Sequence, residues 1–196
     1  MQRALSSLAI VAALSLATLW IGLGRLPLTG ADEPRYARIA EEMRLAGRWV
    51  TPTLEGRPWL EKPPLYYWIS RAPYALSGSA ETAARVGPAL GAFLTALAVL
   101  WAGTRIWSPL AGVLGAAILV TSLGIAGFGR SASTDMPFTC CLTLALAVLA
   151  VALERDLGWK VLAAWVFLGL AVLGKGPVAR LLAGGTGLLF WYSSGR

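Results

Sequence analysis

Long, largely apolar stretches divide the chain and set its predicted architecture. A helix needs about 20 apolar residues to cross a bilayer, so the distance between charged residues shows whether a stretch can span it. The predicted spans are 4–24, 86–104, 106–129, 136–153, 158–174 and 178–195. The last two are short, and Lys160 at one end of the fifth can snorkel toward the interface. We therefore predict an all-α membrane protein, a polytopic helical bundle with about six transmembrane helices.

The first stretch follows one basic residue, Arg3, which is also typical of a signal peptide. Its apolar run is longer than the roughly 7–15 residues of a signal-peptide core, and the small residues near Gly30 lie well beyond it. This pattern favours a first helix that stays in the protein over one that is cleaved.

One long polar segment, 25–85, separates the first two spans and holds nine of the 17 basic and seven of the 10 acidic residues. It begins with an amphipathic helix: Tyr36, Ile39 and Met43 share one face, and Gly47 ends the helix. Aromatic residues follow in short order, and amphipathic rings are most stable at the membrane surface. We predict an outer loop with helices that lie along the interface.

Six crossings place the segment 25–85, the loop 130–135 and the turn at Lys175 on one side of the membrane. The charged residues that should share this side are Asp32, Glu61, Lys62, Asp135 and Lys175. Such groups at helix ends are costly unless they pair or bind a charged ligand. Twelve Lys and Arg residues fall on this side and five on the other, but the long outer segment dominates the count, so charge alone leaves the orientation open.

Composition narrows the class of protein further. The chain of 196 residues is 57% hydrophobic and only 14% charged, with no His and a net charge of +7. The lack of His excludes His-based acid/base catalysis and His-ligated metal from this chain alone. The basic residues are scattered between apolar spans, which favours anionic lipid over nucleic acid as a partner. The adjacent Cys140 and Cys141 lie in an apolar run and are interpreted as small hydrophobic residues.

Short polar motifs stand out against this apolar background. They are Asp32-Glu33-Pro34-Arg35-Tyr36-Ala37, Glu61-Lys62-Pro63-Pro64 followed by aromatics, Arg130 to Met136, and Gly174-Lys175-Gly176-Pro177. In this order they resemble the N-terminal half of the GT-C glycosyltransferases of the aminoarabinose lipid A transferase and protein O-mannosyltransferase superfamily, over residues 5–191. The resemblance implies that residues 1–196 are the N-terminal part of a GT-C transmembrane domain.

The resemblance also implies an activity and a location. Such enzymes transfer a sugar from a polyprenyl-phosphate donor to lipid A or another lipid or protein acceptor, at the periplasmic side of the bacterial inner membrane. No cofactor and no nucleic acid are expected. Family members continue through further helices, so we expect a fragment of a larger enzyme that is inactive alone.

Residue roles follow from the resemblance, each with a simpler alternative. Asp32 is expected to orient or deprotonate the acceptor, or else to cap the helix after it. Asp135 is expected to be a second catalytic residue that contacts substrate, or else a cap or a partner for Arg130. Lys62 suits a phosphate-binding cation, with a solvated loop lysine paired with Glu61 or Glu55 as the alternative.

Further substrate-binding candidates are Glu33, Tyr66, Arg85 and Lys175. For Lys175, snorkelling explains the residue as well as contact with lipid phosphate does. Interfacial anchoring similarly explains Arg85 and Tyr66. No metal is assigned, since Glu61 is a metal ligand only in a longer chain that supplies histidines.

A different class of function stays open from the residues alone. A small transporter, flippase or assembly subunit also gathers charges on one side to bind an anionic lipid, without catalysis. Paired Gly-Pro breaks in an inverted repeat would favour a transporter. The Gly-Pro pairs at 87–88 and 176–177 have flanking sequences that do not repeat.

Overall fold

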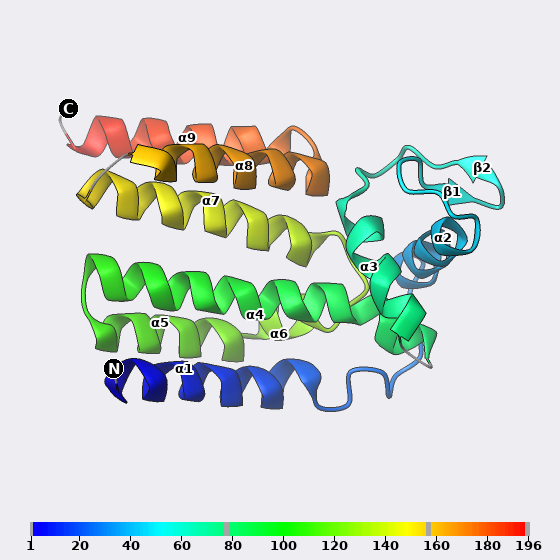
Figure 1. Cartoon of the computed structure of the whole chain (residues 1–196), viewed down its shortest axis with the longest axis horizontal. Coiled ribbons are helices and arrows are strands. Elements are labelled where there is room, and N and C mark those ends of the chain that lie inside the picture. The colour runs from blue at the N-terminus through cyan, green and yellow to red at the C-terminus, as the bar shows by residue number, and fades with distance from the viewer. Residues whose placement is uncertain (1, 77–78, 156–157, 195–196) are drawn as a thin grey trace.

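Helices that run side by side form the body of the protein in the computed structural model, which describes residues 2–76, 79–155 and 158–194. Figure 1 shows these helices alongside one another, with a smaller cap at one end of the bundle. The bundle helices are α1 (Gln2–Ser15), α4 (Ala80–Ile106), α5 (Pro109–Thr121), α6 (Leu123–Gly129), α7 (Asp135–Arg155), α8 (Gly158–Lys175) and α9 (Val178–Ser194). A π-helical turn, η1 (Leu16–Trp20), extends α1. The cap holds α2 (Asp32–Leu45), β1 (Thr53–Leu54), β2 (Arg57–Pro58) and α3 (Leu65–Leu76).

The helical membrane bundle predicted from the sequence is confirmed. Within the described residues, α4, α7 and α8 are long and apolar enough to cross a membrane, and α5 with α6 provides a fourth span if the bent pair is counted as one. The apolar helix at Leu5–Trp20 is shorter, and α9 has 17 residues. The number of six crossings therefore stays a prediction.

The stretch 106–129, predicted as one span, consists of two helices that differ in direction by 60°. The break lies at Ser122, whose backbone is extended (φ −67°, ψ 144°) and whose Oγ accepts a hydrogen bond from the backbone N–H of Ile125. Ser122 thereby ends α5 and caps α6, because its side chain satisfies a donor that the helix start leaves free. The chain returns to the capped end of the bundle through this bend.

Small residues allow the bundle helices to approach closely. A cluster of apolar side chains joins α1, α4 and α5, and it contains Ala89, Ala92, Ala96 and Ala116. Between α4 and α5, a Cβ placed on Gly112 would lie 2.5 Å from the Leu100 carbonyl oxygen. Contact of this kind is typical of membrane helices, where close packing replaces the hydrophobic effect as the driving force.

The cap is held together by a second cluster and by one carboxylate. Tyr36, Ile39 and Met43 of α2 pack against Tyr66 and Tyr67 of α3, as the amphipathic pattern of residues 34–46 predicts. Glu42 of α2 accepts hydrogen bonds from the backbone N–H groups of Glu55 and Gly56, at 3.0 and 3.4 Å. These bonds fasten the turn of the β1–β2 hairpin, in which Thr53 pairs with Pro58, to the cap helix.

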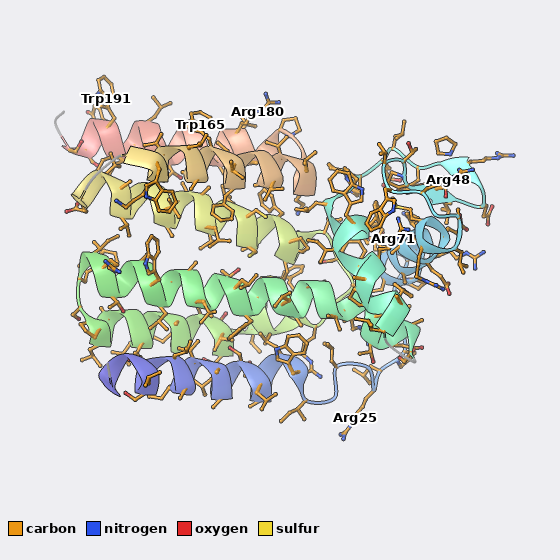
Figure 2. All side chains as sticks on the ribbon, viewed as in Figure 1. Arg25, Arg48, Arg71, Trp165, Arg180 and Trp191 are labelled. Carbon is orange, nitrogen blue, oxygen red and sulfur yellow. The ribbon has the colours of Figure 1, made fainter. Side chains whose placement is uncertain are left out.

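The side of the bundle formed by α8 and α9 carries a broad apolar surface. Figure 2 shows Trp165 of α8 and Trp191 of α9 pointing away from the other helices. Both side chains are exposed, and only 17% of the α8 span is buried. Lipid, rather than water, is the solvent that suits this surface.

The close approach of α4 and α5 generates a prediction. Gly112→Ala should lower the free energy of unfolding by about 1–3 kcal/mol, because the added Cβ meets the backbone oxygen of Leu100, which cannot rotate away. Thermal unfolding in detergent measures the change. The matched control is Gly169→Ala in α8, where nothing lies within 4 Å of the new Cβ. Equal stability of the two variants would contradict the close packing of α4 and α5.

Candidate functional site

A pocket at the capped end of the bundle gathers two of the predicted site lysines. It encloses about 480 Å³ between residues 50–52, residues 60–64 and the turn between α8 and α9. Glu61, Lys62 and Lys175 supply its charged side chains. The two prolines after Lys62 restrict the backbone there, and Gly176 takes the left-handed conformation (φ 73°) that ends α8. Segments more than 110 residues apart in the sequence therefore form one site.

Lys62 is the cation of this pocket that lacks a protein counter-charge. Its side chain is half-buried, and among the described residues none forms a hydrogen bond or an ion pair with it. The alternative of a loop lysine paired with Glu61 or Glu55 is therefore not what the structure contains. A partly desolvated ammonium without a partner favours an anion in the pocket.

Lys175 differs, because it pairs with Asp135. Lys175 is the last residue of α8 and Asp135 the first residue of α7, and their side chains form an ion pair. The side chains are 40% and 34% exposed, and ion pairs exposed to this degree contribute only about 0–1 kcal/mol. Arg130, the partner expected for Asp135, instead donates to the carbonyls of Thr18 and Ile21 at the end of the first helix.

Asp32 lies on the surface of the cap. Its side chain is 65% exposed and lies 3.5 Å from the guanidinium of Arg35. The residue before it, Ala31, is the N-cap of α2, and no side chain caps that helix. The capping role considered for Asp32 is thus absent, which leaves its carboxylate available for other contacts.

The side chain of Tyr36 is buried in the cap, in the cluster that contains Tyr66 and Tyr67. Burial raises the pKa of this phenol, and the charges of Asp32, Glu61 and Asp135 raise the pKa further, while the charge of Arg35 opposes them. The three acidic side chains therefore act on one hydroxyl, although they come from three different segments. Sequence reasoning placed Tyr36 only on the buried face of an interfacial helix and did not count it as a site residue. Its position within the motif Asp32–Ala37 was the sequence feature that could have identified it as a site residue.

Glu33 and Arg85 form a buried ion pair rather than an open binding group. The Nη2 of Arg85 lies 2.8 Å from the Oε2 of Glu33, and the side chains are only 5% and 12% exposed. Arg85 also donates to the carbonyls of Leu23, Leu26 and Pro27, at 3.3, 2.7 and 2.9 Å. Its donors are thus directed at protein groups.

The carboxylate of Glu33 is equally occupied. It accepts hydrogen bonds from the backbone N–H groups of Thr29 and Ala132, at 2.9 and 2.7 Å. Burial alone would raise its pKa, but the bonds from Arg85, Thr29 and Ala132 outweigh burial and hold the pKa below its ordinary value. This geometry favours a positioning role for Glu33 and Arg85 over the direct substrate contact predicted for them.

Tyr66 is also enclosed by protein. Its side chain is fully buried, and its hydroxyl donates to the carbonyl of Ala84 at 2.9 Å. The ring lies 5.9 Å from the ring of Tyr36 and 5.6 Å from that of Tyr67. We therefore infer that Tyr66 supports the wall of the site, rather than binding substrate as predicted.

The sequence also matches a known family. The profile described as dolichyl-phosphate-mannose-protein mannosyltransferase matches residues 61–196. The chain belongs to this family. The matched region contains the Glu61-Lys62-Pro63-Pro64 motif and both Asp135 and Lys175, whereas the Asp32 motif precedes it. The resemblance predicted from the motifs is thereby confirmed.

Individual members of the family give the same result. An undecaprenyl phosphate-alpha-4-amino-4-deoxy-L-arabinose arabinosyl transferase from Erwinia tasmaniensis is 34% identical over 141 residues, which cover 71% of this chain and 26% of the relative. A second transferase of this name, from Pseudomonas fluorescens Pf-5, is 35% identical over 167 residues and covers 80% and 29%. The chain therefore spans less than a third of the length of these relatives.

A solved structure matches the fold as well. The crystal structure of ArnT from Cupriavidus metallidurans bound to undecaprenyl phosphate superposes with a TM-score of 0.88 at 26% sequence identity. The match covers 94% of this chain and 35% of ArnT. The cap and the bundle together thus have the arrangement of one part of that family member.

Cation–π contacts are a further feature of this chain that sequence reasoning missed. The guanidinium of Arg71 lies 3.6 Å from the ring centre of Trp49, and its Nη1 donates to the carbonyl of Arg48. Figure 2 shows Arg71 and Arg48 together on the cap side of the molecule. These contacts brace the segment that leads into the pocket. Within the described residues, no group of three His, Cys, Asp or Glu side chains is placed to hold a metal ion, and Glu61 as a ligand in a longer chain stays a prediction.

The buried pair generates a stability prediction. Glu33→Gln should destabilise the chain by about 3–5 kcal/mol, because it leaves the Arg85 guanidinium buried without a counter-charge. Arg38→Met is the control: it removes a cation that is 59% exposed and pairs with Glu42, so it should cost about 1 kcal/mol or less. Thermal unfolding in detergent compares them, and similar losses would contradict the structural role of the buried pair.

The same pair predicts a pH dependence. The pKa of Glu33 is lowered in the folded state from its ordinary value of 4.5, so its contribution to stability is fully present above pH 4.5. That contribution is lost as the pH falls through the lower pKa of the folded state. Unfolding measured from pH 7 downward should therefore show a steeper loss of stability below pH 4.5 in the wild type than in Glu33→Gln.

Proposed function

We propose that this chain forms the donor-phosphate and acceptor side of a membrane glycosyltransferase. In this proposal a sugar moves from a polyprenyl-phosphate donor to lipid A or to another lipid or protein acceptor, on the periplasmic side of the bacterial inner membrane. The observation that carries the proposal is the unpaired Lys62 beside Lys175 in one pocket, in a fold similar to that of ArnT bound to undecaprenyl phosphate. The names of the relatives favour a transferase over a transporter, flippase or assembly subunit.

Charge development during transfer accounts for the two kinds of charged residue. As the sugar leaves the donor, positive charge grows at its anomeric carbon and negative charge grows on the phosphate. Lys62 stabilises the phosphate, because its ammonium has no partner to release first among the residues that the structure describes. Lys175 adds a second cation once its bond to Asp135 opens.

The carboxylates act on the other substrate. Asp32 orients or deprotonates the acceptor nucleophile, since its side chain is exposed and free of a capping role. Asp135 is the second catalytic carboxylate and contacts substrate from the first turn of α7. Glu33, Arg85 and Tyr66 hold these groups in place from beneath.

The proposal predicts the effect of two substitutions on transfer. Asp32→Asn and Lys62→Ala should each remove at least about 2 kcal/mol of transition-state stabilisation, a loss of tens-fold or more in rate. Transfer from a radiolabelled polyprenyl-phosphate sugar is measured in membranes, with the chain alone and with the remaining part of a full-length relative co-expressed. Arg57→Gln removes an exposed cation of the hairpin and serves as the control. Near-normal transfer by either site variant would remove that residue from the mechanism.

A second prediction concerns the side of the membrane. With Cys140 and Cys141 replaced by Ala, single cysteines from Arg57→Cys and Pro177→Cys should react with a membrane-impermeant reagent added to the periplasm. Cysteines from Trp107→Cys and Trp159→Cys, both exposed positions at the other end of the bundle, should not react. The reverse pattern would place the pocket in the cytoplasm and contradict a periplasmic transferase.

A further inference from the structure

The two partners of the Asp135–Lys175 ion pair line different pockets. Lys175 lines the pocket of about 480 Å³ that also contains Lys62. Asp135 lines a different pocket, of about 290 Å³, together with Ser122, Met136 and Thr139. Each partner of the pair therefore lines a pocket of its own.

The backbones that carry the pair are closely packed, so a rearrangement of the side chains is easier than one of the helices. A Cβ placed on Gly174 would lie 3.1 Å from the Cα of Phe138, which shows how tightly α8 packs on α7 there. The backbone N–H of Gly176 donates to the carbonyl of Val172 at 2.7 Å and closes the end of α8. The lysine side chain has four rotatable bonds, whereas the helices that carry the pair cannot move apart without losing this contact.

The two charges remain supported when the pair opens. Asp135 is the first residue of α7, where the helix dipole favours a negative charge, and Lys175 is the last residue of α8, where the dipole favours a positive charge. Because both side chains are also partly exposed, water replaces part of the lost interaction. A phosphate group in the larger pocket can therefore compete with Asp135 for Lys175.

We propose that the carboxylate of Asp135 and a phosphate group in the larger pocket are alternative partners of Lys175, so that phosphate binding releases Asp135 toward the smaller pocket. This inference rests on the proposed function, since it concerns the same phosphate site. The carboxylate of Asp135 is then free to contact the acceptor only when the donor phosphate is bound. Lys175 moves further toward the phosphate as negative charge grows there during transfer.

Binding of undecaprenyl phosphate to the whole chain in phosphatidylcholine nanodiscs tests the competition. Asp135→Asn should tighten binding at least about threefold, because the neutral amide competes less well for Lys175. Lys175→Met should weaken binding at least about threefold, and in that background Asp135→Asn should have no effect on the dissociation constant. If Asp135→Asn instead weakens binding or leaves it unchanged, or changes it equally in both backgrounds, the competition is wrong.

Matched controls remove charges of the same sign that do not touch the pair. Arg180→Gln on α9 and Glu154→Gln near the far end of α7 should leave the dissociation constant within about twofold of the wild type. A change in binding by Glu154→Gln as large as that by Asp135→Asn would point to net charge rather than to competition and would overturn the inference. Thermal unfolding of each variant checks that the fold is kept.

The failure of this inference is distinguishable from the failure of the proposed function. If undecaprenyl phosphate binds and Lys62→Ala weakens that binding, the phosphate site stands, and Asp135→Asn alone decides the competition. If the wild-type chain binds no undecaprenyl phosphate, both proposals fall. Inorganic phosphate, titrated in the same way, shows whether the pocket recognises the phosphate group alone or requires the lipid.

Release of Asp135 has a direct chemical readout. Modification of carboxylates by a water-soluble carbodiimide and an amine, followed by peptide mass spectrometry, should increase at Asp135 when undecaprenyl phosphate is added. Glu154 at the other end of α7 is the internal reference and should not change. Unchanged or decreased modification of Asp135 at saturating undecaprenyl phosphate would contradict its release.

Discussion

The buried ion pair between Arg85 and Glu33 is the interaction on which the position of the whole cap depends. The guanidinium of Arg85 reaches from the start of α4 to the carbonyls that follow the first helix and to Glu33 in α2. Glu33 in turn accepts from the backbone of Ala132, in the loop before α7. Four segments therefore meet at two side chains. Burying the two charges is costly in isolation, but here each charge has its hydrogen-bonding positions filled by protein groups, which is the condition under which a buried pair is tolerated.

The second ion pair, between Asp135 and Lys175, differs from the buried pair in its exposure and in its partners. Glu33 and Arg85 lie nine-tenths buried or close to it and share extra backbone partners, so they act as a fixed joint. Asp135 and Lys175 are more than a third exposed on average and, among the residues that the structure describes, form an ion pair only with each other, so their bond is weak enough to exchange. The fixed pair holds the cap over the bundle, and each partner of the weak pair lines a different pocket. With the buried Glu33–Arg85 pair holding the fold, the exposed Asp135–Lys175 pair can exchange partners without a change of fold.

The sequence predicted the parts of this structure that depend on local patterns. The apolar spacing predicted the membrane helices, and the 3.6-residue period predicted the buried face of α2 with Tyr36, Ile39 and Met43. It did not predict which charges are buried. Asp32 and Glu33 are neighbours of the same charge, yet one is 65% exposed and the other 12%. The difference arises from Arg85, 52 residues further along, and no local pattern encodes such a contact. The 60° bend at Ser122 was missed for a related reason, because a serine in an apolar run is compatible with a continuous helix as well as with a cap.

The same limit explains why the sequence named the charged residues of the pocket but did not predict the pocket itself. The motifs named Lys62 and Lys175, but only the folded chain shows that Lys175 has a counter-charge and that Lys62 has none within the described part of the chain. A half-buried ammonium without a partner lowers stability when its pocket is empty, because lost hydration is not replaced. An anion that enters the pocket restores that interaction, so part of its binding free energy comes from relieving the unpaired charge. In the proposed mechanism, Lys62 attracts an anion without giving up another partner, whereas Lys175 does so only in exchange for Asp135. A single phosphate would then both bind in the larger pocket and release the Asp135 carboxylate toward the smaller one.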